Sequence, residues 1–264
     1  MKIIEGHLEN MYYKYLNSGK NHTLIFLHGF TGNSTIWDEH IEILKDSYNL
    51  LFVDLVGHGK SNSPESIKEY SFESQAGKIA KIIEKTNDGS ISLITYSYSC
   101  YIGLLIYNKL KPRVMSMIFI SPYLRNNFNF IENSVFRFIS FMWKYLVSNK
   151  KHDLDYSRLK NYEKPTLGDT KYTLRSINTK DLLGSIYALR KSREDLSLEN
   201  IKIPLLIIYG ENDKMLLPKI RKYFQNLEAV KMKKIENKKH LFLKTHSLEI
   251  AKTIKSFVSQ RSPQ

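Results

Sequence analysis

The fold of this chain is decided by the stretch Ile91-Ser92-Leu93-Ile94-Thr95-Tyr96-Ser97-Tyr98-Ser99-Cys100. Its first half is a short apolar run typical of a buried strand, and a mostly apolar helical segment follows to residue 109. A serine in the turn between them lies at a helix N-terminus, where the helix dipole and free N–H groups favour negative charge. We predict that Ser97 occupies this turn and is the nucleophile, whereas its rival Ser99 is expected inside the helix.

Short apolar runs alternate with helical patterns on both sides of this stretch, which predicts an α/β fold with a mostly parallel central sheet flanked by helices. The alternation breaks between about residues 123 and 195, where an aromatic-rich segment precedes a polar, helix-like one. We therefore predict a core formed by residues 1–122 and 196–264, with residues 123–195 inserted as a helical cap after the sixth strand. The other expected strands are residues 23–27, 49–53, 114–120, 204–209 and 229–235, and the other expected helices are 37–45, 72–85, 218–227 and 247–258.

Two further loops at expected strand ends carry residues of complementary chemistry. His28-Gly29-Phe30 follows the strand of residues 23–27, and Gly210-Glu211-Asn212-Asp213 follows the strand of residues 204–209. His240 lies in a loop before the last expected helix. Because ligand sites form at the carboxyl ends of such strands, we expect these side chains to meet Ser97 there.

The order Ser…Asp…His is typical of the α/β-hydrolases and differs from both serine-protease orders. Along essentially the whole chain the sequence resembles the α/β-hydrolase superfamily. His28-Gly29-Phe30 matches the oxyanion turn of that family, Asp54-Leu55-Val56-Gly57-His58-Gly59-Lys60-Ser61 matches its D-x-x-G-x-G-x-S loop, and Gly210-Glu211-Asn212-Asp213 matches its acid loop. The resemblance implies an α/β-hydrolase fold and a serine hydrolase.

The resemblance also implies a role for each candidate residue. His240 acts as general base and then general acid for Ser97, and Asp213 orients His240. The backbone N–H groups of Phe30 and Tyr98 form the oxyanion hole, which His28 and Gly29 support. This chemistry requires neither a metal nor an organic cofactor.

The turn at Ser97 departs from the family pattern, which is usually Gly-x-Ser-x-Gly. Thr95 and Ser99 replace the two glycines, and Thr95 is β-branched. Either the neighbouring helices are shifted or the turn is more strained than usual. This departure from the family pattern bears on the catalytic activity of the protein more than on its fold.

Several residues have a structural interpretation instead of a chemical one. In isolation, Ser97 could be a helix cap and Asp213 a turn residue. His58 is expected to be structural, and His246 is expected to open the last helix. Cys100 is interpreted as a small buried packing residue.

Composition sets the limits of the prediction. The chain has 264 residues, 42% hydrophobic and 25% charged, which is ordinary for a globular protein. A single cysteine excludes an internal disulfide and a multi-cysteine zinc site. The sequence shows neither a signal-peptide pattern nor an apolar run long enough to span a membrane, so we expect a soluble cytoplasmic protein without stable membrane association.

The net charge of +14 is unevenly distributed. Residues 1–121 carry 12 basic and 12 acidic side chains, so the excess lies entirely in the rest of the chain. Either genomic bias or an acidic partner accounts for it, and we find no nucleic-acid-binding motif. The capped relatives that the sequence most resembles include pimeloyl-acyl-carrier-protein methyl ester esterases, which suggests an acyl carrier protein as a partner. The candidate docking residues are the cap arginines: Arg125, Arg137, Arg158, Arg175, Arg190 and Arg193.

Our leading hypothesis is a carboxylesterase that cleaves a small acyl ester or thioester, with the methyl ester of pimeloyl-acyl carrier protein in biotin synthesis as a specific candidate. The same triad can serve a lyase or a C–C bond hydrolase, for example of the menaquinone-pathway type. A catalytically silent binding relative is the third alternative. One sequence does not expose the cap pocket that distinguishes these alternatives.

Overall fold

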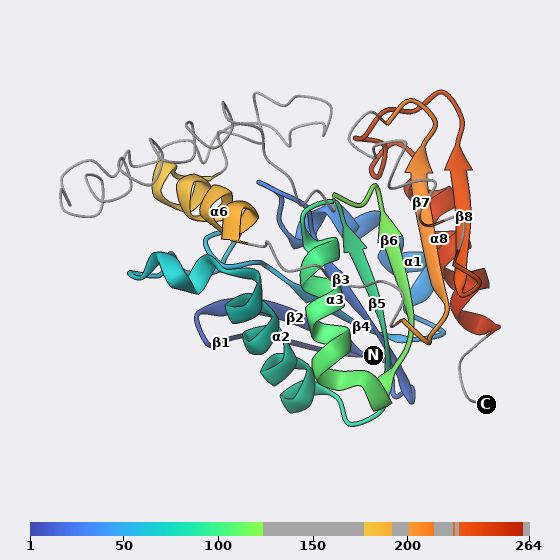
Figure 1. The fold of residues 1–264 in the computed structure, drawn as a ribbon. Coiled ribbons are helices and arrows are strands. Elements are labelled where there is room, and N and C mark those ends of the chain that lie inside the picture. The colour runs from blue at the N-terminus through green and yellow to red at the C-terminus, as the bar shows by residue number, and fades with distance from the viewer. Residues whose placement is uncertain (124–176, 192–200, 214–223, 225–226, 261–264) are drawn as a thin grey trace.

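A computed structural model describes residues 1–123, 177–191, 201–213, 224 and 227–260 (Figure 1). Within them, eight strands form one sheet in the order β1-β2-β4-β3-β5-β6-β7-β8. The pairs β1–β2 and β2–β4 are antiparallel and the others are parallel, which confirms the predicted α/β-hydrolase architecture. The strands are β1 (Lys2–Leu8), β2 (Met11–Asn17), β3 (His22–Leu27), β4 (Asn49–Val53), β5 (Ser90–Tyr96), β6 (Val114–Ile120), β7 (Leu205–Gly210) and β8 (Val230–Ile235).

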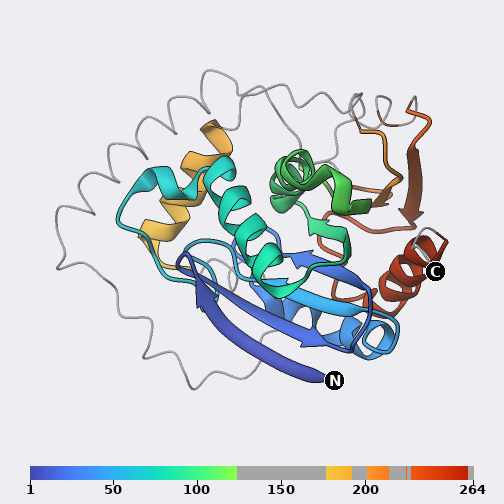
Figure 2. The same ribbon diagram turned by 90° about the horizontal axis from the view of Figure 1, so that it is seen from below.

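The helices cover both faces of the sheet (Figures 1 and 2). On one face α2 (Phe72–Thr86) packs against α3 (Ser99–Leu110), and on the other α1 (Asp38–Leu44) packs against α8 (Ser247–Ser259). Each pair buries its apolar side chains on the sheet in its own core cluster, for example Ile79 and Ile83 of α2 on one face. These helices confirm the expected ones to within a few residues, whereas the expected helix of residues 218–227 lies almost entirely outside the described residues.

The described residues also form three short 3-10 helices: η1 (Ser34–Trp37), η2 (Ile67–Tyr70) and η3 (Lys111–Arg113). The first of them leads directly into α1, and α1 lies within the expected helix of residues 37–45.

The antiparallel hairpin β1–β2 was not expected from the sequence. Its two loop residues, Glu9 and Asn10, both have positive φ (54° and 67°), as the two-residue hairpin turn that matches strand twist requires. Glycine is the usual marker of such a turn, and none is present in this loop. The hairpin extends the sheet beyond β4, away from the strand ends that carry the candidate site.

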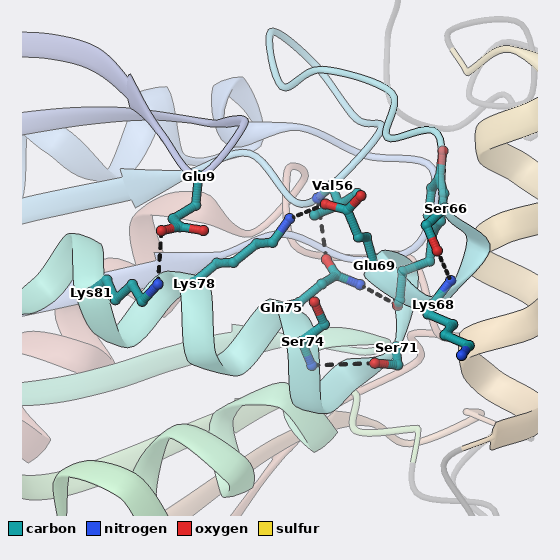
Figure 3. A network of polar contacts seen from close by, with 11 residues as sticks. Glu9, Val56, Ser66, Lys68, Glu69, Ser71, Ser74, Gln75, Lys78 and Lys81 are labelled. Atoms are coloured by element: carbon teal, nitrogen blue, oxygen red, sulfur yellow. Dashed lines mark hydrogen bonds and ion pairs between the residues drawn. The ribbon is translucent and has the colours of Figure 1, made fainter.

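The long loop after β4 is held by polar contacts with α2 (Figure 3). The side chain of Gln75 accepts a hydrogen bond from the Val56 amide (3.2 Å) and donates one to the Tyr70 carbonyl (2.8 Å). Lys78 pairs with Glu69 at 2.6 Å. These contacts fix both ends of the loop, and with it the D-x-x-G-x-G-x-S segment beside the His28 turn.

Helix α6 (Thr179–Lys191) is the described part of the range predicted as a cap, and it packs against η2. Its Asp181 is almost completely buried and accepts hydrogen bonds from the Tyr70 hydroxyl, the Ser63 hydroxyl (2.5 Å) and the Asn178 amide. Burial raises the pKa of this carboxyl, although the hydrogen bonds oppose the shift. The aromatic-rich segment of the predicted cap lies outside the described residues. Among the described helices, none is long and apolar enough to cross a membrane.

Candidate active site

Ser97 forms the sharp turn between β5 and α3. Its φ is +52°, a region that non-glycine residues rarely occupy and that stores backbone strain. The turn is held in place because the Ser97 amide donates to the Ile120 carbonyl at 2.9 Å, while the Ser97 carbonyl accepts from the amides of Cys100 (3.1 Å) and Tyr123 (3.3 Å). A strained strand-to-helix turn of this kind is the geometry that presents a nucleophile at the top of the sheet.

A chain of two hydrogen bonds joins Ser97 to His240 and Asp213. The Ser97 Oγ lies 2.8 Å from His240 Nε2, and His240 Nδ1 lies 2.9 Å from Asp213 Oδ2. The Asp213 side chain is fully buried and the His240 side chain is 14% exposed. Because a carboxylate faces Nδ1, the proton of the neutral ring belongs on Nδ1, which leaves Nε2 free to accept the Ser97 proton. The structure thus brings together the three side chains that the sequence singled out.

The loops that carry Asp213 and His240 are built on one another. The Asn212 amide donates to the Lys238 carbonyl at 2.8 Å, and the Asp213 amide donates to the Gly210 carbonyl at 3.0 Å. Any side chain at Gly210 would collide with this arrangement, because its Cβ would lie 2.4 Å from the Lys238 carbonyl oxygen. The glycine of the acid loop is therefore required for the close approach of the histidine loop.

Two hydroxyl groups donate hydrogen bonds to the backbone of His240, and neither was predicted from the sequence. The Tyr96 hydroxyl donates to the His240 carbonyl at 3.2 Å, and the Ser121 hydroxyl donates to the same oxygen at 3.1 Å. The Tyr96 ring also stacks on the His240 ring, with centroids 6.1 Å apart. Burial raises the pKa of Tyr96, so its hydroxyl keeps the proton that it donates.

The His28 turn lies beside the nucleophile turn. The Nδ1–H of His28 donates to the Gly29 carbonyl (2.8 Å), and its Nε2 accepts from the Leu55 amide (2.9 Å). Complete burial lowers the pKa of His28 to about 4, so the ring is neutral and serves as a hydrogen-bonding brace for the turn. The Phe30 ring lies 5.6 Å from the Tyr98 ring, which places the two expected oxyanion-hole residues side by side. Tyr98 precedes the first residue of α3, where amides have no helical acceptor.

The methyl group of Thr95 is accommodated by a glycine on the neighbouring helix. A Cβ at Gly103 of α3 would lie only 2.9 Å from Thr95 Cγ2. The absence of that Cβ gives the β-branched residue room at the position where the family usually has glycine. The Thr95 side chain therefore fits at this position without a displacement of α3 and without additional backbone strain at Thr95.

The rival candidates occupy structural positions. Ser99 is fully buried and is the first residue of α3, as expected, whereas Ser97 is 7% exposed. His246 lies directly before α8, also as expected. His58 is buried, and desolvation lowers its pKa to about 3. Desolvation likewise raises the pKa of the buried Cys100 thiol to about 12, which makes it a poor nucleophile.

Of the candidate docking residues, one lies in the described part of the chain. Arg190 lies on α6 and is partly exposed. The other five, Arg125, Arg137, Arg158, Arg175 and Arg193, lie outside the described residues.

Residues 22–247 match the model of the family described as alpha/beta hydrolase fold. The chain is 26% identical over 276 residues to the pimeloyl-[acyl-carrier protein] methyl ester esterase of Wigglesworthia glossinidia brevipalpis, covering 96% of this chain and 99% of that protein.

Among solved structures, it resembles a thermophilic esterase from Thermogutta terrifontis (TM-score 0.75, 14% identity, 98% and 99% of the two chains covered) and MenH from S. aureus (TM-score 0.73, 23% identity, 94% and 98% covered). These two likenesses concern the fold. The family match covers most of the chain, and the chain therefore belongs to the α/β-hydrolase family.

Proposed function

We propose that the protein is a serine carboxylesterase whose nucleophile is Ser97. The observation that carries this proposal is the continuous hydrogen-bonded chain from the Ser97 hydroxyl through His240 to the buried Asp213 carboxylate. A protein that only binds a ligand has no need of this alignment on a strained turn. The Ser97 Oγ attacks the ester carbonyl while His240 Nε2 takes its proton, and His240 then returns that proton to the leaving alcohol. Water, deprotonated by the same nitrogen, hydrolyses the acyl-enzyme.

The negative charge that develops on the carbonyl oxygen is stabilised by the backbone amides of Phe30 and Tyr98. The adjacency of the two residues and the position of Tyr98 before α3 support this assignment. Asp213 stabilises the imidazolium form of His240 during each proton transfer. Loss of one oxyanion donor typically costs about 10²–10³ in turnover.

A fluorophosphonate probe tests the nucleophile. We expect the wild-type protein to be labelled and Ser97→Ala to remain unlabelled. The matched control is Ser256→Ala, an exposed serine on α8, which we expect to be labelled like the wild type. Labelling of Ser97→Ala at the wild-type rate would overturn the assignment.

The narrower proposal is that the acyl group is an ester or thioester carried by an acidic acyl carrier protein, which docks on the cap formed by residues 123–195. The name of the Wigglesworthia relative and the basic excess in the second half of the chain support it. Carrier-bound esters should then react faster than free esters, and the advantage should shrink steeply as salt is added.

Two lysines provide a sharper form of this experiment. Lys239 is exposed and precedes the catalytic histidine, whereas Lys231 is exposed at the start of the edge strand β8. We expect Lys239→Gln to slow hydrolysis of the carrier-bound ester about two- to fivefold at low salt and to leave the free ester unaffected, with Lys231→Gln as the matched control. Equal rates on free and carrier-bound esters at both salt concentrations would contradict carrier docking. Turnover of C–C bonded substrates alone would favour the lyase or C–C hydrolase alternative.

A further inference from the structure

The hydroxyl of Ser99 has no role in the chemistry described above, although it stands where the family usually has glycine. Ser99 has 0% exposure, so no substrate reaches it. A buried hydroxyl is costly unless its hydrogen bonds are satisfied. Its partners therefore indicate what it does.

The Ser99 hydroxyl connects the nucleophile turn to the strand that leads into the oxyanion turn. The Tyr96 amide at the end of β5 donates to Ser99 Oγ (3.1 Å), and Ser99 Oγ donates to the Leu27 carbonyl at the end of β3 (3.0 Å). The Tyr96 carbonyl lies 3.2 Å from the same oxygen. One side chain thus bridges the final residues of two adjacent strands.

The two strand ends lead to the two halves of the oxyanion hole. Leu27 is followed by His28-Gly29-Phe30, and Phe30 supplies one proposed amide. Tyr98, which supplies the other, is the residue immediately before Ser99. Because oxyanion stabilisation depends on fixed donors at defined distances, a group that sets the separation of these segments controls it.

We infer that Ser99 is a positioning residue, whose hydroxyl holds the Phe30 and Tyr98 amides at the separation that the developing oxyanion requires. The inference rests on the proposed role of Ser97. It predicts that the typical family residue, glycine, is harmful at this position in this chain. Without the hydroxyl, the Leu27 carbonyl and the Tyr96 amide lose their common partner, and the two segments lose the link that joins them beyond the last paired residues of β3 and β5.

The experiment compares Ser99→Ala and Ser99→Gly with the wild type, and uses Ser116→Ala as the matched control. Ser116 on β6 is equally buried, and its hydroxyl lies 2.7 Å from the Ser92 hydroxyl, near the beginning of the strands and away from the candidate site. Steady-state kinetics use p-nitrophenyl butyrate. Inhibition is measured with an alkyl trifluoromethyl ketone, which forms a tetrahedral oxyanion on the serine, and with the corresponding methyl ketone, which imitates the ground state.

We expect both Ser99 variants to lose about ten- to a hundredfold in kcat, because small misplacements of catalytic groups have effects of this size, with KM changed less than about threefold. Affinity for the trifluoromethyl ketone should fall by the same factor as kcat/KM, and affinity for the methyl ketone should stay constant. The pH dependence of kcat/KM should keep its wild-type shape, because the substitution leaves the contacts among Ser97, His240 and Asp213 in place. Ser116→Ala should retain wild-type kcat whatever its thermal stability.

Wild-type kcat in Ser99→Gly, or equal losses of affinity for the two ketones, would overturn the inference. So would a matching loss of kcat in Ser116→Ala, because it would indicate that the loss of any buried hydroxyl lowers kcat. If the wild type is labelled at Ser97 and the Ser99 variants keep wild-type kcat, only this inference is overturned. A wild-type protein that is not labelled would overturn the proposed function and this inference with it.

Discussion

The contact between Thr95 and Gly103 allows a quantitative prediction about the nucleophile turn. In Gly103→Ala the new Cβ would lie 2.9 Å from Thr95 Cγ2, whereas two carbon atoms are at their optimal separation at about 3.5–4.0 Å. The clash has no easy relief, because both Thr95 and Gly103 lie in a fully buried environment between β5 and α3. Overpacking of this size costs about 1–3 kcal/mol.

A second effect opposes the clash. Alanine is a better helix former than glycine by about 1 kcal/mol, and Gly103 is in the interior of α3. We therefore expect Gly103→Ala to lower the free energy of unfolding by about 0–2 kcal/mol, the difference between the two contributions. In a Thr95→Ala background the clashing methyl group is absent, and the same substitution should stabilise the protein.

A double-mutant cycle isolates the contact. Urea unfolding of the wild type, the two single variants and the double variant should give a coupling energy of about 1–3 kcal/mol, with the double variant more stable than the sum of the single effects predicts. The labelling rate of Ser97 by a fluorophosphonate should fall in Gly103→Ala and recover in the double variant, because the clash displaces the turn. Additivity within about 0.5 kcal/mol would refute the argument that Gly103 compensates for Thr95.

Three further predictions concern buried groups: His40 on α1, Asp181 on α6, and Tyr96 beside His240. Burial holds the pKa of His40 at about 4 against an ordinary value of 6.5, so the unfolded state binds an extra proton as pH falls through 6.5 and stability is lost down to about pH 4. His40→Gln should therefore lose about 2–3 kcal/mol less than the wild type between pH 7 and pH 4 in urea titrations, and an unchanged pH slope would contradict this. Asp181→Ala leaves the Tyr70 hydroxyl and two other donors without their acceptor and should cost about 2–4 kcal/mol, whereas Asp181→Asn should retain most of the stability measured by the same method. Tyr96→Phe removes one of two hydroxyls from the His240 carbonyl and should lower kcat on p-nitrophenyl butyrate about two- to tenfold with KM unchanged; a rise in KM alone would exclude the positioning role.

The parallel part of the sheet could be predicted from the sequence because local patterns determine it. Runs such as residues 49–53 and 114–120 are apolar apart from Asn49 and Ser116, as is typical of strands buried on both faces, and the observed bounds of β4 and β6 are the predicted ones. The hairpin β1–β2 could not be predicted in this way. β1 is largely exposed at the sheet edge, and its turn at Glu9 and Asn10 uses positive φ without glycine.

The same distinction applies to the candidate site. Ser97 and Asp213 each follow a strand in a recognisable motif, and His240 lies before the last helix, so their residue types and order were sufficient to select them. Tyr96 occupies a variable position of the Gly-x-Ser-x-Gly pattern and Ser121 belongs to no motif. Both contact His240 only once strands distant in sequence have assembled. The compensation of Thr95 by Gly103 likewise depends on how α3 packs on β5, and no property of either residue alone indicates it.

The lysines near His240 have a structural use as well as a proposed functional one. β8 is the last strand in the sheet order, and charged side chains on such an edge discourage pairing with other chains. Lys234 is paired with Glu211 at 2.7 Å, and Lys233 with Glu249 at 2.9 Å, so part of the basic excess is neutralised within the fold. For Lys239, no acidic partner is found within the described part of the chain. Lys239 is exposed on the loop that carries His240, which is why the response of the Lys239 variant, and not the total charge, bears on the proposed carrier docking.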